Sequence, residues 1–204
     1  MNIPQTARLL LLVTCLSSVS CVLGKREAAV KVPAGTHPAS KGAARIASVQ
    51  DARSFQNQPS DPSTPSIDGD ASALTPAQRE NYIGRQRNGY GKGMGEVILP
   101  ANGTVTAKMG EIVTEALARR GYTVGSSGTP VSVKIRQFWG WMSPGMWAIT
   151  LEARIQADVA VGGRTAALEG HGSNVCQAAT TANWELAYER AVTDFIDKAV
   201  AAGL

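Results

Sequence analysis

The chain has 204 residues, and its 20 basic and 16 acidic side chains give a net charge of +4 at neutral pH. These charges are interspersed, without the dense lysine and arginine cluster that would indicate a nucleic-acid partner. Only two histidines are present, His37 and His171, which excludes a multi-histidine metal site. We therefore expect no metal, no cofactor and no nucleic acid.

The first 24 residues have the layout of a secretory signal. One cation, Arg8, precedes an apolar run at 9–16, and small residues follow at 17–20. The apolar run is well short of the roughly 20 residues that a membrane-spanning helix needs. The sequence thus predicts export, with 1–20 as the signal peptide.

Cys21 stands where lipoprotein signals place the cysteine that receives a lipid. Val19, Ser20 and Cys21 resemble such a lipobox, although Ser18 occupies a position where leucine is usual. A plain cleavage after Gly24 also fits the small-residue rule. We expect a lipid anchor on Cys21, with a soluble secreted protein as the alternative.

Proline and glycine dominate much of the next 80 residues. Residues 25–43 lack a sustained apolar period, so they predict a flexible tether between the lipidated N-terminus and a single domain at 44–204. A first strand is expected at 44–51. The segment 54–103 then predicts a long loop, because four prolines fall within 59–76 and five glycines within 84–95. Its glycines do not match a phosphate-binding loop, which leaves a surface loop or an extended edge.

Two later segments have the apolar period of amphipathic helices. Thr104 is a plausible N-cap for the first helix, and two arginines and Gly121 mark its end. The second helix is expected over 181–202. The apolar stripes are formed by Val105, Met109, Ile112, Val113, Ala116 and Leu117, and by Trp184, Tyr188, Ala191, Val192, Phe195, Ile196, Ala199 and Val200.

Between these helices, alternating apolar and polar residues predict three strands, near 131–141, 147–161 and 164–171. A hairpin loop at 143–145 would place Trp141 opposite Trp147. A two-residue turn at Gly162 and Gly163 would bring Ala166, Leu168 and Gly170 onto the core face. The expected fold is therefore α+β, an antiparallel three- to four-stranded sheet covered on one face by two amphipathic helices, in the order strand-helix-strand-strand-strand-helix.

Three of the four tryptophans, Trp139, Trp141 and Trp147, flank the predicted hairpin tip and would share one face of the sheet. Cross-strand packing in the core is one interpretation of such a group. The other is a patch that faces a partner or the bilayer interface, where tryptophan is enriched. The core interpretation is favoured for Trp139 and the partner interpretation for Trp141.

Four segments together resemble the YajG-like envelope lipoproteins: 45–53, 83–91, 117–124 and 131–135. The resemblance implies a lipoprotein on the periplasmic face of the outer membrane with no catalytic residues to carry over. The proline-rich insertion at 54–80 departs from the compact pattern of that family.

No arrangement of residues in the sequence indicates an enzyme. His171 and Cys176 lack an evident orienting group, so they are interpreted as a solvated histidine and a buried thiol. Asp51 and Arg53 are interpreted as a structural ion pair. Two functions stay open: a non-catalytic envelope lipoprotein that contacts other envelope proteins, and a soluble secreted or periplasmic module that binds a small ligand or glycan.

Overall fold

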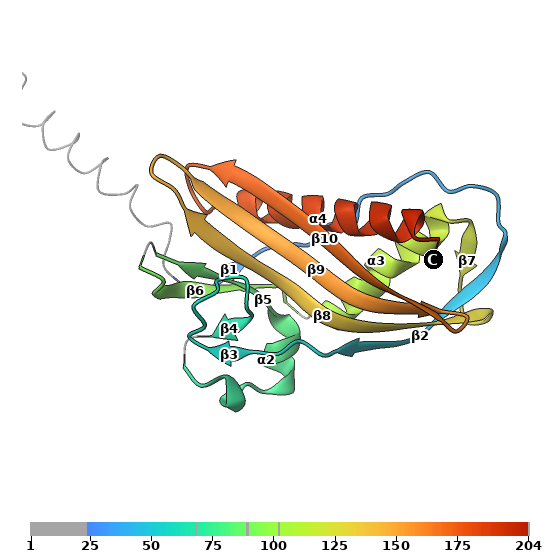
Figure 1. The fold of residues 1–204 in the computed structure, drawn as a ribbon, viewed down its shortest axis with the longest axis horizontal. Coiled ribbons are helices and arrows are strands. Elements are labelled where there is room, and N and C mark those ends of the chain that lie inside the picture. The colour runs from blue at the N-terminus through green and yellow to red at the C-terminus, as the bar shows by residue number, and fades with distance from the viewer. Residues whose placement is uncertain (1–23, 68, 89, 102, 204) are drawn as a thin grey trace, which may run out of the picture.

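The computed structural model describes residues 24–67, 69–88, 90–101 and 103–203 (Figure 1). A mixed eight-stranded sheet forms its frame, and two long helices lie on one face of that sheet. A separate two-stranded sheet belongs to an insertion on the other face. The elements are β1 (Arg26–Glu27), β2 (Gly42–Asp51), β3 (Gln56–Asn57), β4 (Ser66–Ile67), η1 (Ala71–Ala73), α2 (Pro76–Asn81), β5 (Tyr82–Arg87), β6 (Gly93–Ile98), α3 (Val105–Arg119), β7 (Tyr122–Val124), β8 (Thr129–Pro144), β9 (Ile149–Val161), β10 (Arg164–Cys176) and α4 (Thr181–Ala201).

Strand β8 is the spine of the sheet. One of its edges pairs with β9, which pairs in turn with β10, and both pairings are antiparallel. The other edge pairs in parallel with β2 along its first half and with β5 near its end. Beyond these lie β7, beside β2, and β6 and β1, beside β5. The expected three- to four-stranded antiparallel sheet is therefore wrong, because the pairings of β8 with β2 and β5 join segments far apart in the sequence.

Helices α3 and α4 cover one face of the sheet, called the inner face below (Figure 1). The predicted apolar stripes of both helices are confirmed, since every residue in them is buried except Val200, which is half-buried. Thr104 and Thr180 cap the helices through side-chain oxygens that accept backbone N–H groups. Gly170 and Gly172 let the backbone of α4 lie directly against β10, because a Cβ there would meet α4 backbone atoms at 2.2–2.3 Å.

A β-bulge between Ile135 and Gln137 changes which side chains of β8 face the helices. Before the bulge odd-numbered residues point to the inner face, and after it Phe138 and Met142 do so. The hairpin loop is Gly145 to Ala148 rather than 143–145, and Trp141 lies opposite Glu152 rather than Trp147. The predicted register of this hairpin is thus wrong, because pairing continues to Pro144 and Ile149 and the loop lies later in the chain than 143–145. The bulge then shifts the pairing by one more residue.

The second hairpin follows the predicted register. Gly162 and Gly163 form its turn, both with positive φ, and Leu168 lies opposite Ala157. Leu168 is buried on the inner face, whereas its neighbour Glu169 is exposed. The prediction that a two-residue turn sends the even positions inward is confirmed.

The insertion between β2 and β5 packs on the opposite face of the sheet, called the outer face. It contains β3, β4, η1 and α2, so the long loop expected over 54–103 is wrong for this part of the chain. Its apolar residues form a second core with residues of β5, β6 and the end of β8. The residues of that core are Phe55, Ile67, Ala71, Leu74, Tyr82, Ile98, Trp139 and Trp141. Prolines did not prevent order here, because the prolines lie between the short elements or, at Pro76, begin a helix.

The glycine-rich segment after the insertion forms a hairpin, β5 and β6, in place of the expected loop. Gly84 has no side chain, which allows close approach to the carbonyl of Gly140: a Cβ at Gly84 would lie 2.6 Å from that oxygen. The segment is thus extended with a closely approaching glycine, but β5 lies inside the sheet, between β8 and β6, and not at its edge.

The expected flexible tether is also wrong for the described part of 25–43. Residues Ala28 and Val30 are buried in the main core. The Ala29 amide donates to Glu185 at 3.2 Å, and the Gly35 amide donates to Glu115 at 2.7 Å. This segment crosses the helix layer from one end of the sheet to the other before β2 begins (Figure 1).

Arg53 lies where the pairing partner of β8 changes from β2 to β5. Its guanidinium donates to the carbonyls of Tyr82 at 2.7 Å, Phe138 at 3.1 Å and Arg79 at 2.5 Å. It also pairs with Asp51 at 2.8 Å, and both side chains are almost fully buried. The interpretation of these two residues as a structural ion pair is confirmed.

Candidate functional site

Of the three tryptophans predicted to share a face, Trp139 and Trp141 do so, and Trp147 does not. Trp139 is fully buried on the outer face, where Phe55 contacts it edge-on at 5.8 Å between ring centroids. Trp141 lies on the same face and is 7% exposed. Trp147 lies in the loop between β8 and β9 and is 84% exposed. Of the three, only Trp147 offers a partner a large free surface, so the expected solvent-facing position of Trp141 is wrong.

Trp141 is covered by polar neighbours from β9 and β10. The Arg154 guanidinium lies 5.3 Å from the Trp141 ring centroid, and the His171 ring stacks on it at 6.4 Å. The His171 ring nitrogen is 2.7 Å from a Glu152 carboxylate oxygen. A cation above the indole and a stacked imidazole occupy the contacts that a partner would otherwise make.

Four large apolar side chains of the described residues are strongly exposed: Tyr90 at 98%, Met146 at 88%, Trp147 at 84% and Val175 at 69%. We call this set the strand-end surface. Tyr90 and Met146 were missed from the sequence, although each stands beside glycine in a turn, where no alternating pattern explains an apolar residue. That isolation within glycine-rich turns is the signal that would have found them.

Strand pairing brings these residues to one end of the sheet. Because β5 runs parallel to β8, with Arg85 beside Trp141, the turn after β5 and the turn after β8 point the same way. Val175 on β10 lies opposite Thr150, which pairs with Ser143 at the same end of β8. Both hairpin tips lie at the left end of the molecule in Figure 1.

The described chain begins at the same end. The Gly24 amide donates to the carbonyl of Met94 at 2.9 Å, just after the β5–β6 turn. From there β1 runs parallel to β6, away from the strand-end surface. The predicted lipidation site, Cys21, lies outside the described residues and is three positions before Gly24.

A polar hollow of about 520 Å³ adjoins this end, between β5 and the insertion. Arg85, Arg87 and Lys92 are among the residues that line it. Both arginines hold the insertion: Arg85 donates to the Ile67 carbonyl at 2.6 Å, and Arg87 to the Ser66 hydroxyl at 2.8 Å. Burial lowers the pKa of both guanidinium groups. The three basic side chains make the hollow cationic, and its two arginines also hold the insertion to β5.

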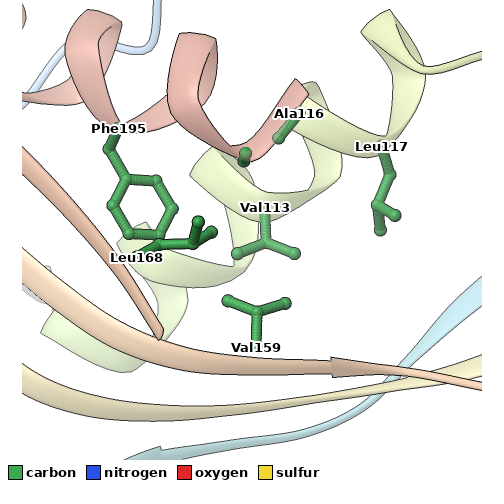
Figure 2. Close-up of a pocket in the computed structure, with 7 residues that line it drawn as sticks. Val113, Ala116, Leu117, Val159, Leu168 and Phe195 are labelled. Atoms are coloured by element: carbon green, nitrogen blue, oxygen red, sulfur yellow. The ribbon is translucent and has the colours of Figure 1, made fainter. Parts of the chain in front are cut away.

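A second space lies between α3, α4 and the inner face of β9 and β10. Figure 2 shows apolar side chains lining it, among them Val113, Leu168 and Phe195. Its volume is about 10 Å³, at the lower limit for one water molecule, and every lining residue is apolar. It is a small packing gap and not a binding site.

The residues weighed for catalysis are held apart from one another. His171 pairs with Glu152, and its backbone amide donates to Asp194 at 2.8 Å. Burial raises the pKa of the Cys176 thiol, which disfavours the nucleophilic thiolate. Within the described ranges, no three His, Cys, Asp or Glu side chains gather as a metal site would require. No helix among the residues that the structure describes is long and apolar enough to cross a membrane.

Comparison with known proteins gives few relatives. No protein-family model matches the chain, and no curated protein matches it. Among solved structures, protein XCC0632 from Xanthomonas campestris, assigned to family model DUF330, is 13% identical with a TM-score of 0.49, over 88% of this chain and 93% of that one. A second, described as an uncharacterized protein, is 8% identical with a TM-score of 0.38, over 89% and 97% of the two chains. These structural neighbours are proteins of uncharacterised function.

Proposed function

We propose that the chain is a non-catalytic lipoprotein of the cell envelope, held by a lipid on Cys21 at the periplasmic face of the outer membrane. It would act through contacts with other envelope proteins, as its resemblance to the YajG-like envelope lipoproteins implies. The observation that carries the proposal is the position of Gly24, at the end of the sheet that exposes Tyr90, Met146 and Trp147. An anchor on Cys21 would join the domain at its most apolar end.

The outer face of β9 and β10 is the surface best suited to protein contacts. Cross-strand ion pairs cover it, including Arg136 with Asp158 at 2.6 Å and Arg154 with Glu169 at 3.6 Å. The insertion covers the outer face only beside β5 and the end of β8. The remaining charged area supports a polar and reversible interface rather than an obligate apolar one.

Metabolic labelling with a fatty-acid analogue tests the anchor. The wild-type protein should carry the label and sediment with outer membranes, whereas Cys21→Ala should carry no label and appear in the soluble fraction. Cys176→Ala is the matched control, because it removes a half-buried thiol inside the domain and should leave the labelling unchanged. Labelling that survives in Cys21→Ala would contradict the proposed anchor.

The alternative, a soluble secreted or periplasmic binding module, is favoured by the cationic hollow beside Arg87. Its charge would suit a small anionic ligand, and Lys92 lies at its open rim of turn residues. A glycan platform has less support, because Trp139 and Trp141 are buried. Calorimetric titration of wild type and Lys92→Ala with phosphate and with acidic sugars would separate the two functions: micromolar binding lost in the variant favours the binding module.

A further inference from the structure

We propose that the strand-end surface docks on the lipid bilayer, with Tyr90, Met146 and Trp147 in its interfacial layer. This inference rests on the proposed anchor at Cys21 and adds the orientation of the domain. The hairpin tips would face the membrane. The outer face of β9 and β10 would then be roughly perpendicular to the bilayer and open to the periplasm.

Exposure and residue type support a lipid surface. Two separate turns present these side chains, each at least 84% exposed, and each side chain combines a large apolar area with a position at a strand end. Tryptophan and tyrosine are enriched where membrane meets water, because their rings are apolar and their N–H or O–H groups stay hydrated. The turns at the other end of the sheet, at 125–128 and 162–163, contain only glycine and serine.

Charge supports the same occupant. The three segments that carry the strand-end surface, 88–95, 143–149 and 174–180, contain one lysine and no aspartate or glutamate. The chain as a whole has 16 acidic residues. A surface without carboxylates approaches anionic headgroups without repulsion, and Lys92 would be attracted to them.

Chain length limits how far this surface can be from the bilayer. Gly24 is hydrogen-bonded to β6. The three residue steps from Cys21 to Gly24 span at most about 11 Å even when fully extended. A lipid on Cys21 would therefore hold Gly24 next to the headgroups. Since the exposed turn residues lie at that same end, the bilayer is the occupant that the anchor itself supplies.

Tryptophan fluorescence gives a direct test, because Trp147 is the one strongly exposed tryptophan of the four. The full lipidated protein is reconstituted into vesicles of phosphatidylethanolamine and phosphatidylglycerol, with and without brominated acyl chains. We expect bromine to quench the emission of wild type and to leave Trp147→Phe, which keeps only the buried tryptophans, nearly unquenched. The exposure of Trp147 means that this variant should fold normally.

Three results would overturn the docking surface. Equal and weak quenching of the two proteins would place Trp147 away from the bilayer. Protection of Trp147 from acrylamide without bromine quenching would show that a second copy or a partner protein covers it. Quenching equal to wild type in Trp147→Phe would place the insertion, and not the hairpin tip, at the membrane. In each case fatty-acid labelling of Cys21 reports separately on the anchor.

Discussion

Replacing Arg53 with methionine should destabilise the domain more than any other change to a charged residue. The variant keeps an apolar side chain of similar length but leaves the buried Asp51 carboxylate without its partner. It also removes the donors to the carbonyls of Tyr82 and Phe138 at the junction of β2 and β5. Breaking a buried ion pair from one side costs about 3–5 kcal/mol. For a domain of this size that corresponds to a fall in Tm of about 6–20 °C.

Thermal unfolding followed by circular dichroism measures this fall, and Arg136→Met is the matched control. Arg136 pairs with Asp158 on the outer face with its side chain half-exposed, and exposed pairs contribute about 0.2–1 kcal/mol. The control should therefore lower Tm by about 4 °C at most. If the two variants unfold at the same temperature, Arg53 does not stabilise the junction as described.

Three further changes test the packing. Leu168→Lys should lower Tm strongly and Glu169→Lys hardly at all, because only position 168 faces the core; equal melting curves would contradict the register. Gly172→Ala should lower the free energy of unfolding by about 1–3 kcal/mol, because the added Cβ pushes α4 from the sheet. Gly125→Ala, with open space around it, should leave that free energy nearly unchanged, and urea unfolding measures both. Glu115→Gln should reduce the loss of stability on acidification, measured as Tm against pH.

The sign of that last effect follows from the surroundings of Glu115. Burial opposes its ionisation, but hydrogen bonds from Arg119, His37 and the Gly35 amide outweigh burial and lower its pKa. A carboxyl whose pKa is lower in the folded protein stabilises it above the unfolded pKa of about 4.3. That stabilisation disappears as the pH falls through the folded pKa. A wild type and variant that lose Tm in parallel below pH 5 would contradict it.

The sequence predicts the parts of this fold that local patterns determine. The stripes of α3 and α4 repeat over several turns, and the Gly162–Gly163 turn fixes the parity of β10 without reference to the rest of the chain. The pairing of β8 with β2 and β5 has no such local signal. Bringing these distant segments together costs loop-closure entropy. Packing in the folded protein offsets that cost, and this packing cannot be read from one segment of the sequence.

The bulge explains why the predicted faces of Phe138 and Trp139 are wrong. Arg136 is an ordinary polar residue in an alternating strand, so nothing in the sequence marks the bulge that sends Phe138 inward and Trp139 outward. Gln137, on the outer face, donates to the Ser63 carbonyl of the insertion at 2.6 Å. The bulge thus lies where the insertion begins to cover the outer face of β8. That contact is between distant parts of the chain, so no local pattern marks it. The placement of Trp147 changed for a separate reason, the longer hairpin loop.

If Cys21 carries the proposed lipid, the segment after it sets how far the domain can lie from the membrane, and a linker variant separates two causes of the proposed docking. A flexible tether of 19 residues would have let the domain wander about 25 Å from its anchor. Only two residues, Val22 and Leu23, stand between Cys21 and Gly24, whose amide is hydrogen-bonded to Met94. Inserting 16 Gly/Ser residues before Gly24 restores the longer reach and lowers the effective concentration of the domain at the bilayer. If the exposed side chains themselves favour the interface, bromolipid quenching of Trp147 should persist in the linker variant and fall when Met146 and Tyr90 are also changed to serine. Complete loss of quenching on insertion alone would show that the short connection, and not the apolar turns, holds this end at the membrane.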